Sequence, residues 1–202
     1  DVVGVVTFDY AQHAREKELQ CSKALCDRHG LKQYVIPLKF FSEISKSSLN
    51  TNEADLPSGD EVSIDDLKAS QKSAKSVWVP NRNGVFLNIG AAFAEALGAH
   101  VIIPGFNKEE ATTFPDNSED YMKALDQSFS FSTQNQVRVK CYSHAMTKTE
   151  IVRDMKSMSV DWNLIWPCYR SGDKHCGECE SCKRFYRALG EVGVKPYENS
   201  VD

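Results

Sequence analysis

Four of the chain's seven cysteines gather near its C-terminal end, at Cys168, Cys176, Cys179 and Cys182. Two overlapping C-x-x-C steps bring the last three onto one tight turn, and Gly177 lets that turn fold with its thiols inward. Cys168 can supply a fourth thiolate across a short loop. Four thiolates about 2.3 Å from one ion form the tetrahedral shell of zinc, and a filled shell leaves no open position for water. We therefore predict a structural zinc site.

Other interpretations of the cysteines stay open. Four cysteines also ligate iron–sulfur clusters, and reduced thiols can stand without any metal. His175 could replace one cysteine as a ligand, but we expect it to be an exposed neighbour of the site. Cys21, Cys26 and Cys141 lie elsewhere in the chain, and we predict that they are small core residues.

A polar loop at residues 79–84 leads into a predicted helix that is rich in small residues. The free N–H groups of a helix N-terminus favour anions, and the forked donors of Arg82 suit a phosphate or a carboxylate. The alternative is that Arg82 is an ordinary surface ion-pair partner. The sequence alone leaves these two interpretations even.

A second loop, residues 105–118, carries carboxylates, amides, hydroxyls and an aromatic ring at the end of a predicted strand. This mixture suits a purine-like ligand, whose faces need an apolar wall and whose N–H groups need acceptors. We expect Ser118 to cap the helix that follows, which leaves Glu110 and Asp116 for the ligand. The alternative is that residues 116–118 only cap that helix. In a third loop, residues 9–13, His13 could act as an acid or base but is more simply a solvated side chain.

Strands and helices alternate around these loops, which predicts an α/β fold with a parallel sheet covered by helices on both faces. Ligands bind beyond the carboxyl ends of the strands in such sheets. The opening apolar run predicts a fully buried strand. The predicted strands are residues 2–8, 34–38, 101–103 and 137–141, and the predicted helices are residues 15–28 and 84–97, one that follows Glu119 and Asp120, and one that a Thr147–Glu150 capping box opens.

We expect the α/β domain to span residues 1–160 and the zinc segment to span residues 161–202. Residues 42–76 are rich in Ser, Asp, Glu and Lys, which predicts a mobile, mostly solvated insertion with a short helix near residues 64–69. The alternative is a lid over a site.

The composition narrows the class of protein further. The chain has 202 residues, of which 41% are hydrophobic, and a net charge of −4. It can bury a core, it has no apolar run long enough to cross a bilayer, and its charge argues against a general nucleic-acid coat protein. Free cysteines without a secretory signal favour a reducing compartment, so we expect a cytoplasmic protein that acts on small molecules, with no nucleic-acid or membrane partner.

Five short motifs, in this order, resemble those of the 7-cyano-7-deazaguanine (preQ0) synthase family of the PP-loop ATPase superfamily. The resemblance runs from about residue 5 to residue 193. The motifs are Thr7-Phe8-Asp9-Tyr10-x-Gln12, Val79-Pro80-Asn81-Arg82-Asn83, Gly105-Phe106-Asn107-x-Glu109-Glu110, Phe114-Pro115-Asp116-Asn117-Ser118 and Cys168-Tyr169 with Cys176-Gly177-x-Cys179-x-x-Cys182.

The resemblance implies an adenine-nucleotide α-hydrolase-like fold, often in a homodimer. It implies that ATP, with Mg²⁺, activates 7-carboxy-7-deazaguanine, that ammonia then forms an amide, and that dehydration gives the nitrile used in queuosine or archaeosine formation. It also implies zinc on the four clustered cysteines. As site residues it suggests Arg82 and Lys148 for catalysis, and Tyr10, Gln12, Asn83, Phe106, Glu110, Phe114 and Asp116 for substrate binding.

The chain also departs from the family pattern. The family's phosphate loop, Ser-Gly-Gly-x-Asp-Ser, does not occur in these 202 residues, and we expect it to lie upstream of Asp1. Ala11 stands where the family usually has Gly, and His13 where it usually has Arg. Two alternatives to the synthase remain: a tRNA-thiolating PP-loop enzyme with an iron–sulfur cluster, and a zinc-stabilised binding protein without turnover.

Overall fold

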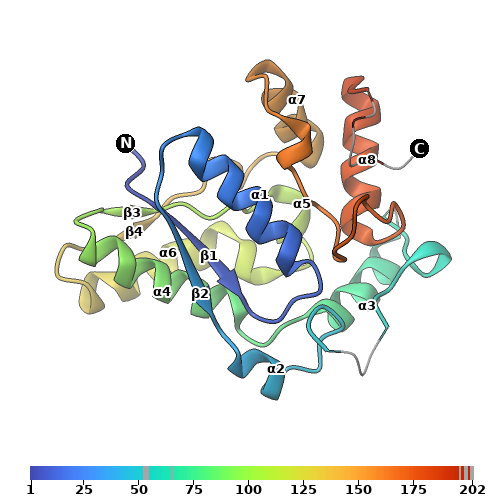
Figure 1. Cartoon of the computed structure of the whole chain (residues 1–202). Coiled ribbons are helices and arrows are strands. Elements are labelled where there is room, and N and C mark those ends of the chain that lie inside the picture. The colour runs from blue at the N-terminus through green and yellow to red at the C-terminus, as the bar shows by residue number, and fades with distance from the viewer. Residues whose placement is uncertain (52–54, 65, 196, 198–199, 201–202) are drawn as a thin grey trace. The chain divides into compact units, whose positions relative to one another are not determined.

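The computed structural model describes residues 1–51, 55–64, 66–195, 197 and 200 (Figure 1). The chain forms two compact units. Unit 1 contains residues 1–80 and 152–202, and unit 2 contains residues 81–151. The expected domain boundary between residues 160 and 161 stays a prediction.

Unit 1 is built on a strand–helix–strand crossover. β1 (Val5–Asp9) pairs in parallel with β2 (Gln33–Pro37), and α1 (Arg15–Arg28) connects the two strands. A parallel pair needs such a crossover because its strands run in the same direction. β1 is only half-buried along its length, so the prediction of a fully buried first strand is wrong.

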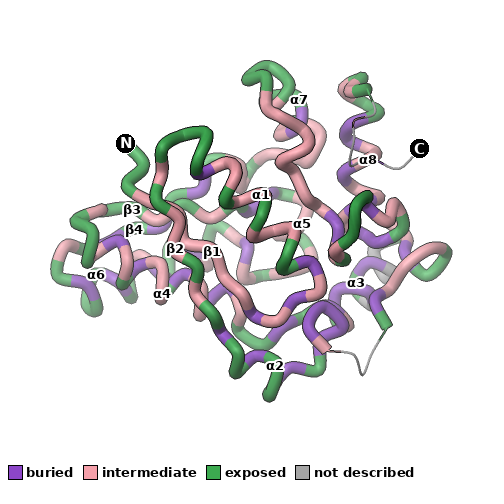
Figure 2. The backbone as a smooth tube through the Cα atoms, in the orientation of Figure 1, coloured by how far each residue is buried: buried purple, intermediate pink, exposed green. Residues whose placement is uncertain are grey.

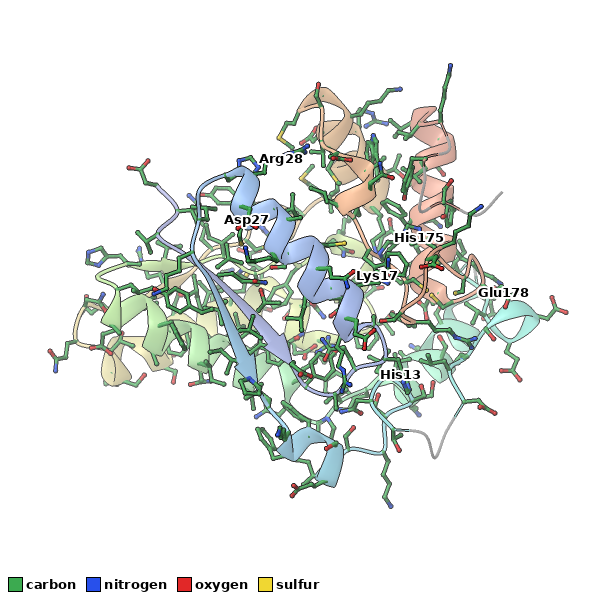
Figure 3. The ribbon with its side chains drawn as sticks, viewed as in Figure 1. His13, Lys17, Asp27, Arg28, His175 and Glu178 are labelled. Carbon is green, nitrogen blue, oxygen red and sulfur yellow. The ribbon has the colours of Figure 1, made fainter. Side chains whose placement is uncertain are left out.

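Contacts along α1 connect this crossover to the C-terminal part of unit 1. The ammonium of Lys17 lies 5.2 Å from the centre of the Trp166 ring, and Arg28 forms a 3.1 Å ion pair with Asp161 at the other end of the helix. Figure 3 shows Lys17 and Arg28 toward opposite ends of α1. Residues more than 130 positions apart in the sequence are therefore neighbours in unit 1.

The C-terminal helix α8 (Glu180–Val192) was not among the predicted elements. It packs Phe185, Ala188 and Leu189 against Val152 in a small apolar core. Gly193 ends the helix with a left-handed conformation (φ 68°), which suits glycine because it has no Cβ. The other elements of unit 1 are α2 (Phe40–Ile44), η1 (Gly59–Glu61), α3 (Leu67–Val77) and η3 (Trp162–Leu164), and α7 (Lys148–Ser157) runs into it from unit 2.

The segment of residues 42–76 is largely packed, and the prediction that it is solvated is wrong for much of its described part. Figure 2 shows a buried stretch between α2 and α3, where Ser48 has no exposed surface and donates its backbone N–H to the carbonyl of Ser76. Serine hydroxyls replace water by bonding to backbone carbonyls here, so a polar composition does not imply a solvated chain. The predicted short helix near residues 64–69 is α3, shifted toward the C-terminus, and residue 65 lies outside the described residues.

This segment docks on the first turns of α8. Glu180 accepts a 2.6 Å hydrogen bond from Ser73 and forms a 2.9 Å ion pair with Arg184. Lys183 donates to the backbone carbonyls of Gly59 and Val62 at 2.6 and 2.8 Å. The charged residues of α8 thus fix a segment that precedes them by more than 100 positions.

Unit 2 holds a parallel strand pair, β3 (Val101–Ile102) and β4 (Arg138–Val139), with helices packed on it. Its core includes Leu87, Phe106, Met122, Phe129 and Val137. The helical elements of unit 2 are α4 (Arg82–Ala96), α5 (Lys108–Ala111), η2 (Pro115–Asn117) and α6 (Glu119–Ser132).

The parallel strand pairing is confirmed, but the sheet is smaller than the sequence suggests. Among the described residues the four strands form two separate two-stranded sheets rather than one. Both strands of unit 2 are only two residues long; Pro104, which has no N–H, follows β3 closely. No helix in the described part of the chain is long and apolar enough to cross a membrane.

Candidate functional site

The four clustered cysteines converge on one point. Their Sγ atoms all lie within 4.8 Å of one another, and those of Cys176 and Cys182 are 3.9 Å apart. A tetrahedron with metal–sulfur bonds of about 2.3 Å has edges of about 3.8 Å, so the group has the dimensions of a single-ion site. Cys168, Cys179 and Cys182 are buried. The prediction that these four cysteines form one metal-competent group is therefore confirmed.

Backbone amides stabilise the sulfur atoms of this group. Cys168 Sγ accepts 3.4 Å hydrogen bonds from the N–H groups of Arg170 and Cys176, and Cys176 Sγ accepts one from Cys179. Hydrogen bonds from the thiols of Cys179 and Cys182, together with these amides, hold the pKa of Cys168 well below its usual value. The turn therefore favours the thiolate form of Cys168, the form that ligates metals, whereas hydrogen bonding to Cys168 raises the pKa of Cys179 and of Cys182.

His175 is buried, which corrects the expectation that it is exposed. Only 2% of its surface is accessible, its Nδ1 lies 2.9 Å from the Tyr186 hydroxyl, and its ring meets Trp166 edge-on at 4.7 Å. Burial lowers the pKa of His175, so it is held neutral. It supports the cysteine loop from outside the four-sulfur group; Figure 3 labels it with Glu178 on the chain leading to α8.

Of the three remaining cysteines, Cys26 and Cys141 are buried as predicted, and Cys21 is half-buried. Burial raises the pKa of Cys21. Cys141 donates a 3.4 Å hydrogen bond to the carbonyl of Phe106 in the core of unit 2. None of them joins the metal group among the described residues.

A second group of polar side chains lies within unit 2. We call Arg82, Glu110, Asp116 and Lys148 the charged cluster. Lys148 at the start of α7 forms a 3.1 Å ion pair with Glu110 of α5, and the pair is mostly sheltered from solvent. Arg82, the first residue of α4, acts electrostatically on both Glu110 and Asp116. Four separate elements thus bring together residues that the sequence spaces over 67 positions.

The two carboxylates of the cluster have different environments. Burial raises the pKa of Asp116, and the opposing effects of Arg82 and the Asn83 side chain do not cancel this shift. Burial also acts to raise the pKa of Glu110, but Lys148, the Asn107 side chain and Arg82 together outweigh it and leave the pKa lowered. Glu110 is therefore engaged by protein groups, whereas Asp116 is the less stabilised anion.

The entry to α4 is built tightly around Gly84. Asn81 before it has a left-handed backbone (φ 50°), and a Cβ on Gly84 would lie 2.9 Å from the Tyr121 hydroxyl and closer still to the Asn81 side chain. Asn83 is buried and accepts a 3.3 Å hydrogen bond from Arg82 Nε. A side chain at position 84 has no space, so glycine is what lets this loop hold Arg82 and Asn83 in place.

The predicted aromatic walls of a ligand site have different surroundings. Phe106 is packed in the core of unit 2 and is 7% exposed, and its contact with a ligand stays a prediction. Phe114 is half-buried, and its N–H donates a 2.8 Å hydrogen bond to the carbonyl of Glu110. Of the two rings, that of Phe114 is the more accessible.

Tyr10 and Gln12 belong to unit 1, and their polar groups build the loop after β1. Gln12 is buried; its Oε1 accepts from the Tyr10 N–H at 2.9 Å, and its Nε2 donates to the Phe8 carbonyl and to Glu18. Ala11 between them has φ 64°, a conformation that costs an alanine more than a glycine. The structure therefore gives these residues a loop-forming role, and their contact with substrate stays a prediction. His13 next to them is anchored, with its N–H bonded to the Leu49 carbonyl and its Nε2 3.2 Å from the Thr51 carbonyl.

Three further residues border the charged cluster, and the sequence predicts no functional role for them. Asn107 caps α5 by accepting the Glu110 N–H at 3.0 Å, and Glu109 accepts the Lys148 N–H at 2.8 Å. The phenol of Tyr121 is near enough to Asp116 for that carboxylate to contribute, after burial, to raising the pKa of Tyr121. The pattern Asn-x-x-Glu after a strand is a helix-start signal that pointed to the first of them.

Comparison with known proteins bears on the motifs that form both groups. The model of the family described as "Queuosine biosynthesis protein QueC" matches residues 1–193. The chain belongs to the QueC family. Membership of this PP-loop family accords with the parallel α/β elements and with the cysteine group at the C-terminal end.

Curated relatives resemble the chain along nearly all of its length. It is 48% identical over 194 residues to the 7-cyano-7-deazaguanine synthase of Bdellovibrio bacteriovorus, covering 96% of this chain and 84% of the relative. It is 46% identical over 190 residues to that of Pelotomaculum thermopropionicum, covering 94% and 86%. For the synthase of Methanosarcina mazei the identity is 45% over 193 residues, covering 94% and 84%.

Proposed function

We propose that this QueC-family protein is a 7-cyano-7-deazaguanine synthase, which joins 7-carboxy-7-deazaguanine and ammonia at the expense of ATP. The observation that carries the proposal is the 45–48% identity, over at least 94% of the chain, to relatives that bear this name. The product belongs to queuosine or archaeosine formation, as the family description indicates for queuosine.

The chemistry needs an activated carboxylate. Attack of the substrate carboxylate on the α-phosphorus of ATP forms an acyl adenylate and releases pyrophosphate. Ammonia then attacks the acyl carbon, and AMP leaves with the former carboxylate oxygen. The oxygen of the resulting amide then attacks a second ATP in the same way and releases pyrophosphate, and loss of AMP, which carries away that oxygen, together with the remaining N–H proton gives the nitrile. Each activation step concentrates negative charge on phosphate oxygens, with Mg²⁺ as the expected counter-ion of ATP.

Arg82 and Lys148 are the cations that we assign to this charge. Both belong to the charged cluster, and both are partly sheltered from water, where electrostatic stabilisation is stronger than in bulk solvent. Arg82 presents a planar fork that suits phosphate or carboxylate oxygens, and Lys148 presents a compact charge. We assign them to catalysis.

For the deazapurine we assign Asp116, Asn83 and Phe114. Ring N–H groups need acceptors, and the Asp116 carboxylate is the less stabilised anion of the cluster. Asn83 supplies an amide beside it, and the half-buried ring of Phe114 supplies an apolar face. Tyr10 and Gln12 were also expected to bind substrate, and they enter this proposal only as residues that shape the loop after β1.

For the four-cysteine group we propose zinc. The Sγ separations fit one ion and are small for a cluster with several irons at its corners. The group supplies a cross-link that fixes the start of α8, and all four positions of its shell are filled by protein. A homodimer and a cytoplasmic location complete the proposal, and light scattering on the purified protein tests the first of these.

The test is to incubate the full-length gene product with ATP, Mg²⁺, ammonium and 7-carboxy-7-deazaguanine and to follow the products by mass spectrometry. We expect the nitrile, with AMP and pyrophosphate, and no nitrile when ATP or ammonium is omitted. Consumption of ATP without nitrile, or nitrile without ATP, contradicts the proposal. Metal analysis of the same preparation checks the zinc assignment, which a brown, iron-containing protein would overturn.

A further inference from the structure

Within the charged cluster, Lys148 is held at two points by one short helix. Its ammonium forms the 3.1 Å ion pair with Glu110, and its backbone N–H donates a 2.8 Å hydrogen bond to Glu109 Oε1. The neighbouring Lys108 N–H donates to the Met146 carbonyl at 2.9 Å, just before α7. Helix α5 therefore fixes both the backbone and the side chain of the lysine that opens α7.

Helix α5 is only four residues long, so its own hydrogen bonds give it little stability. Asn107 compensates: it is 4% exposed, and its Oδ1 accepts the Glu110 N–H at 3.0 Å. The same side chain also interacts with the Glu110 carboxylate. Glu110 thus has its backbone held by the cap and its carboxylate directed at Lys148, which is 16% exposed.

We infer that Glu110 is a positioning residue that holds the ammonium of Lys148 over the site, and that it does not bind the deazapurine itself. This inference rests on the proposed function, and it replaces the substrate-binding role that the sequence suggested for Glu110. The contacts with Lys148 and Asn107 occupy part of the acceptor capacity of the Glu110 carboxylate and orient it toward the lysine. Asp116, which accepts a 3.3 Å hydrogen bond from Asn117 Nδ2, stays the carboxylate that we assign to the substrate N–H groups.

A double-mutant cycle distinguishes the two roles. If Glu110 acts through Lys148, Glu110→Gln and Lys148→Met each lower kcat/KM by about 10- to 100-fold. The kcat/KM of the double variant is then within about threefold of that of the less active single variant. Both single variants should also change the same kinetic constant, whether that is kcat or the KM for ATP. If Glu110 binds the deazapurine, Glu110→Gln raises the KM for 7-carboxy-7-deazaguanine instead, and the losses multiply in the double variant. That result overturns the inference.

The chain offers a matched control in the exposed ion pair of Glu119 and Lys123 on α6, in which Lys123 Nζ lies 2.9 Å from Glu119 Oε1. Glu119→Gln, Lys123→Met and their double variant make the same chemical changes in an ion pair that is exposed to solvent. We expect kcat/KM within about twofold of the wild type for all three, as for other exposed pairs. The unfolding transition of each variant shows that it is folded.

A second measurement does not depend on turnover. Brief acetylation with acetic anhydride, followed by peptide mass spectrometry, reports how available each lysine amine is. We expect Lys148 to react several-fold faster in Glu110→Gln than in the wild type, while its rate is unchanged in Glu119→Gln. An unchanged rate for Lys148 in Glu110→Gln overturns the inference. If the wild-type protein makes no nitrile, the proposed function fails, and the acetylation result still decides the role of Glu110.

Discussion

The cysteine group and the charged cluster each bring four reactive side chains together, but they are assembled differently from the sequence. The cysteine group comes from 15 consecutive residues, Cys168 to Cys182, and its geometry follows from turn spacing. The charged cluster comes from the first residues of α4 and α7, from α5 and from η2, and it exists only when unit 2 is folded. Residues that are closely spaced in the sequence therefore reveal the chemistry of their site directly, whereas a site built from distant residues depends on how the chain packs.

The two regions also differ in how their charges are compensated. In the cysteine group, the proposed zinc ion would neutralise the thiolates, and binding of a structural zinc ion is coupled to folding. In the charged cluster, the positive charges of Arg82 and Lys148 balance the carboxylates of Glu110 and Asp116. Loss of one member therefore has different consequences in the two regions, which leads to four predictions.

The largest effect is expected from loss of a ligand in the cysteine group. Cys182→Ala removes one sulfur from a buried set, so we expect loss of the bound metal and a decrease of at least about 3 kcal/mol in the free energy of unfolding. Metal analysis measures the bound metal, and denaturant unfolding measures the free energy of unfolding. Cys21→Ala is the control, since Cys21 is outside the group and is expected to keep the metal. A metal-loaded, stable Cys182→Ala protein contradicts a four-sulfur site.

In the charged cluster we expect activity to be lost while the metal stays. Arg82→Gln removes the cation that acts on both carboxylates, so nitrile formation should fall by about 10²- to 10³-fold. Metal content should match that of the wild type. An Arg82→Gln protein with wild-type turnover would show that Arg82 is only a structural ion-pair partner.

The entry to α4 provides a smaller and purely steric test. Gly84→Ala pushes a methyl group against Asn81 and the Tyr121 hydroxyl, and we expect it to lower the free energy of unfolding by about 1–3 kcal/mol. Gly90→Ala in the same helix has ordinary contact distance to Ile102 (3.6 Å) and should raise the free energy of unfolding by about 0.5–1 kcal/mol. Equal effects at the two positions would show that the loop is looser than described.

The smallest effect concerns the pH dependence of stability at Asp116. Because burial raises its pKa, the folded state binds this proton more tightly than the unfolded state, and ionisation of Asp116 costs stability at neutral pH. We expect Asp116→Asn to be somewhat more stable than the wild type at pH 7. The difference should shrink as the pH falls through the raised pKa toward the ordinary value for aspartate. Unfolding midpoints from pH 7 to pH 3 measure it, and a gain that grows on acidification would contradict the prediction.

Short-range signals in the sequence predicted local structure well. Helix α1 has the predicted bounds, Arg15–Arg28. Ser118 caps α6 by accepting the Tyr121 N–H, and Thr147 and Glu150 form the predicted capping box at α7. Each of these depends on residues three or four apart, whose contacts exist as soon as the helix forms.

Predictions that depended on long-range packing were less successful. His175 is polar, but the aromatic rings of Trp166, Phe185 and Tyr186 surround it, and two of those residues lie ten or more positions away. Much of the serine-rich segment of residues 42–76 is buried, and hydroxyls such as those of Ser48 and Ser73 donate to backbone carbonyls there. Alternating elements predicted parallel strands correctly, but not that the described residues divide them between two sheets.

The first turn of α8 restricts insertions and deletions in this part of the chain. Cys182 directs its sulfur to the metal group, and the next residue, Lys183, donates to the carbonyls of Gly59 and Val62. Successive residues of a helix point about 100° apart. Deletion or insertion of a single residue between Cys179 and Cys182 would rotate both side chains away from their partners at once. This turn should therefore accept substitutions at its exposed positions while excluding any change of register.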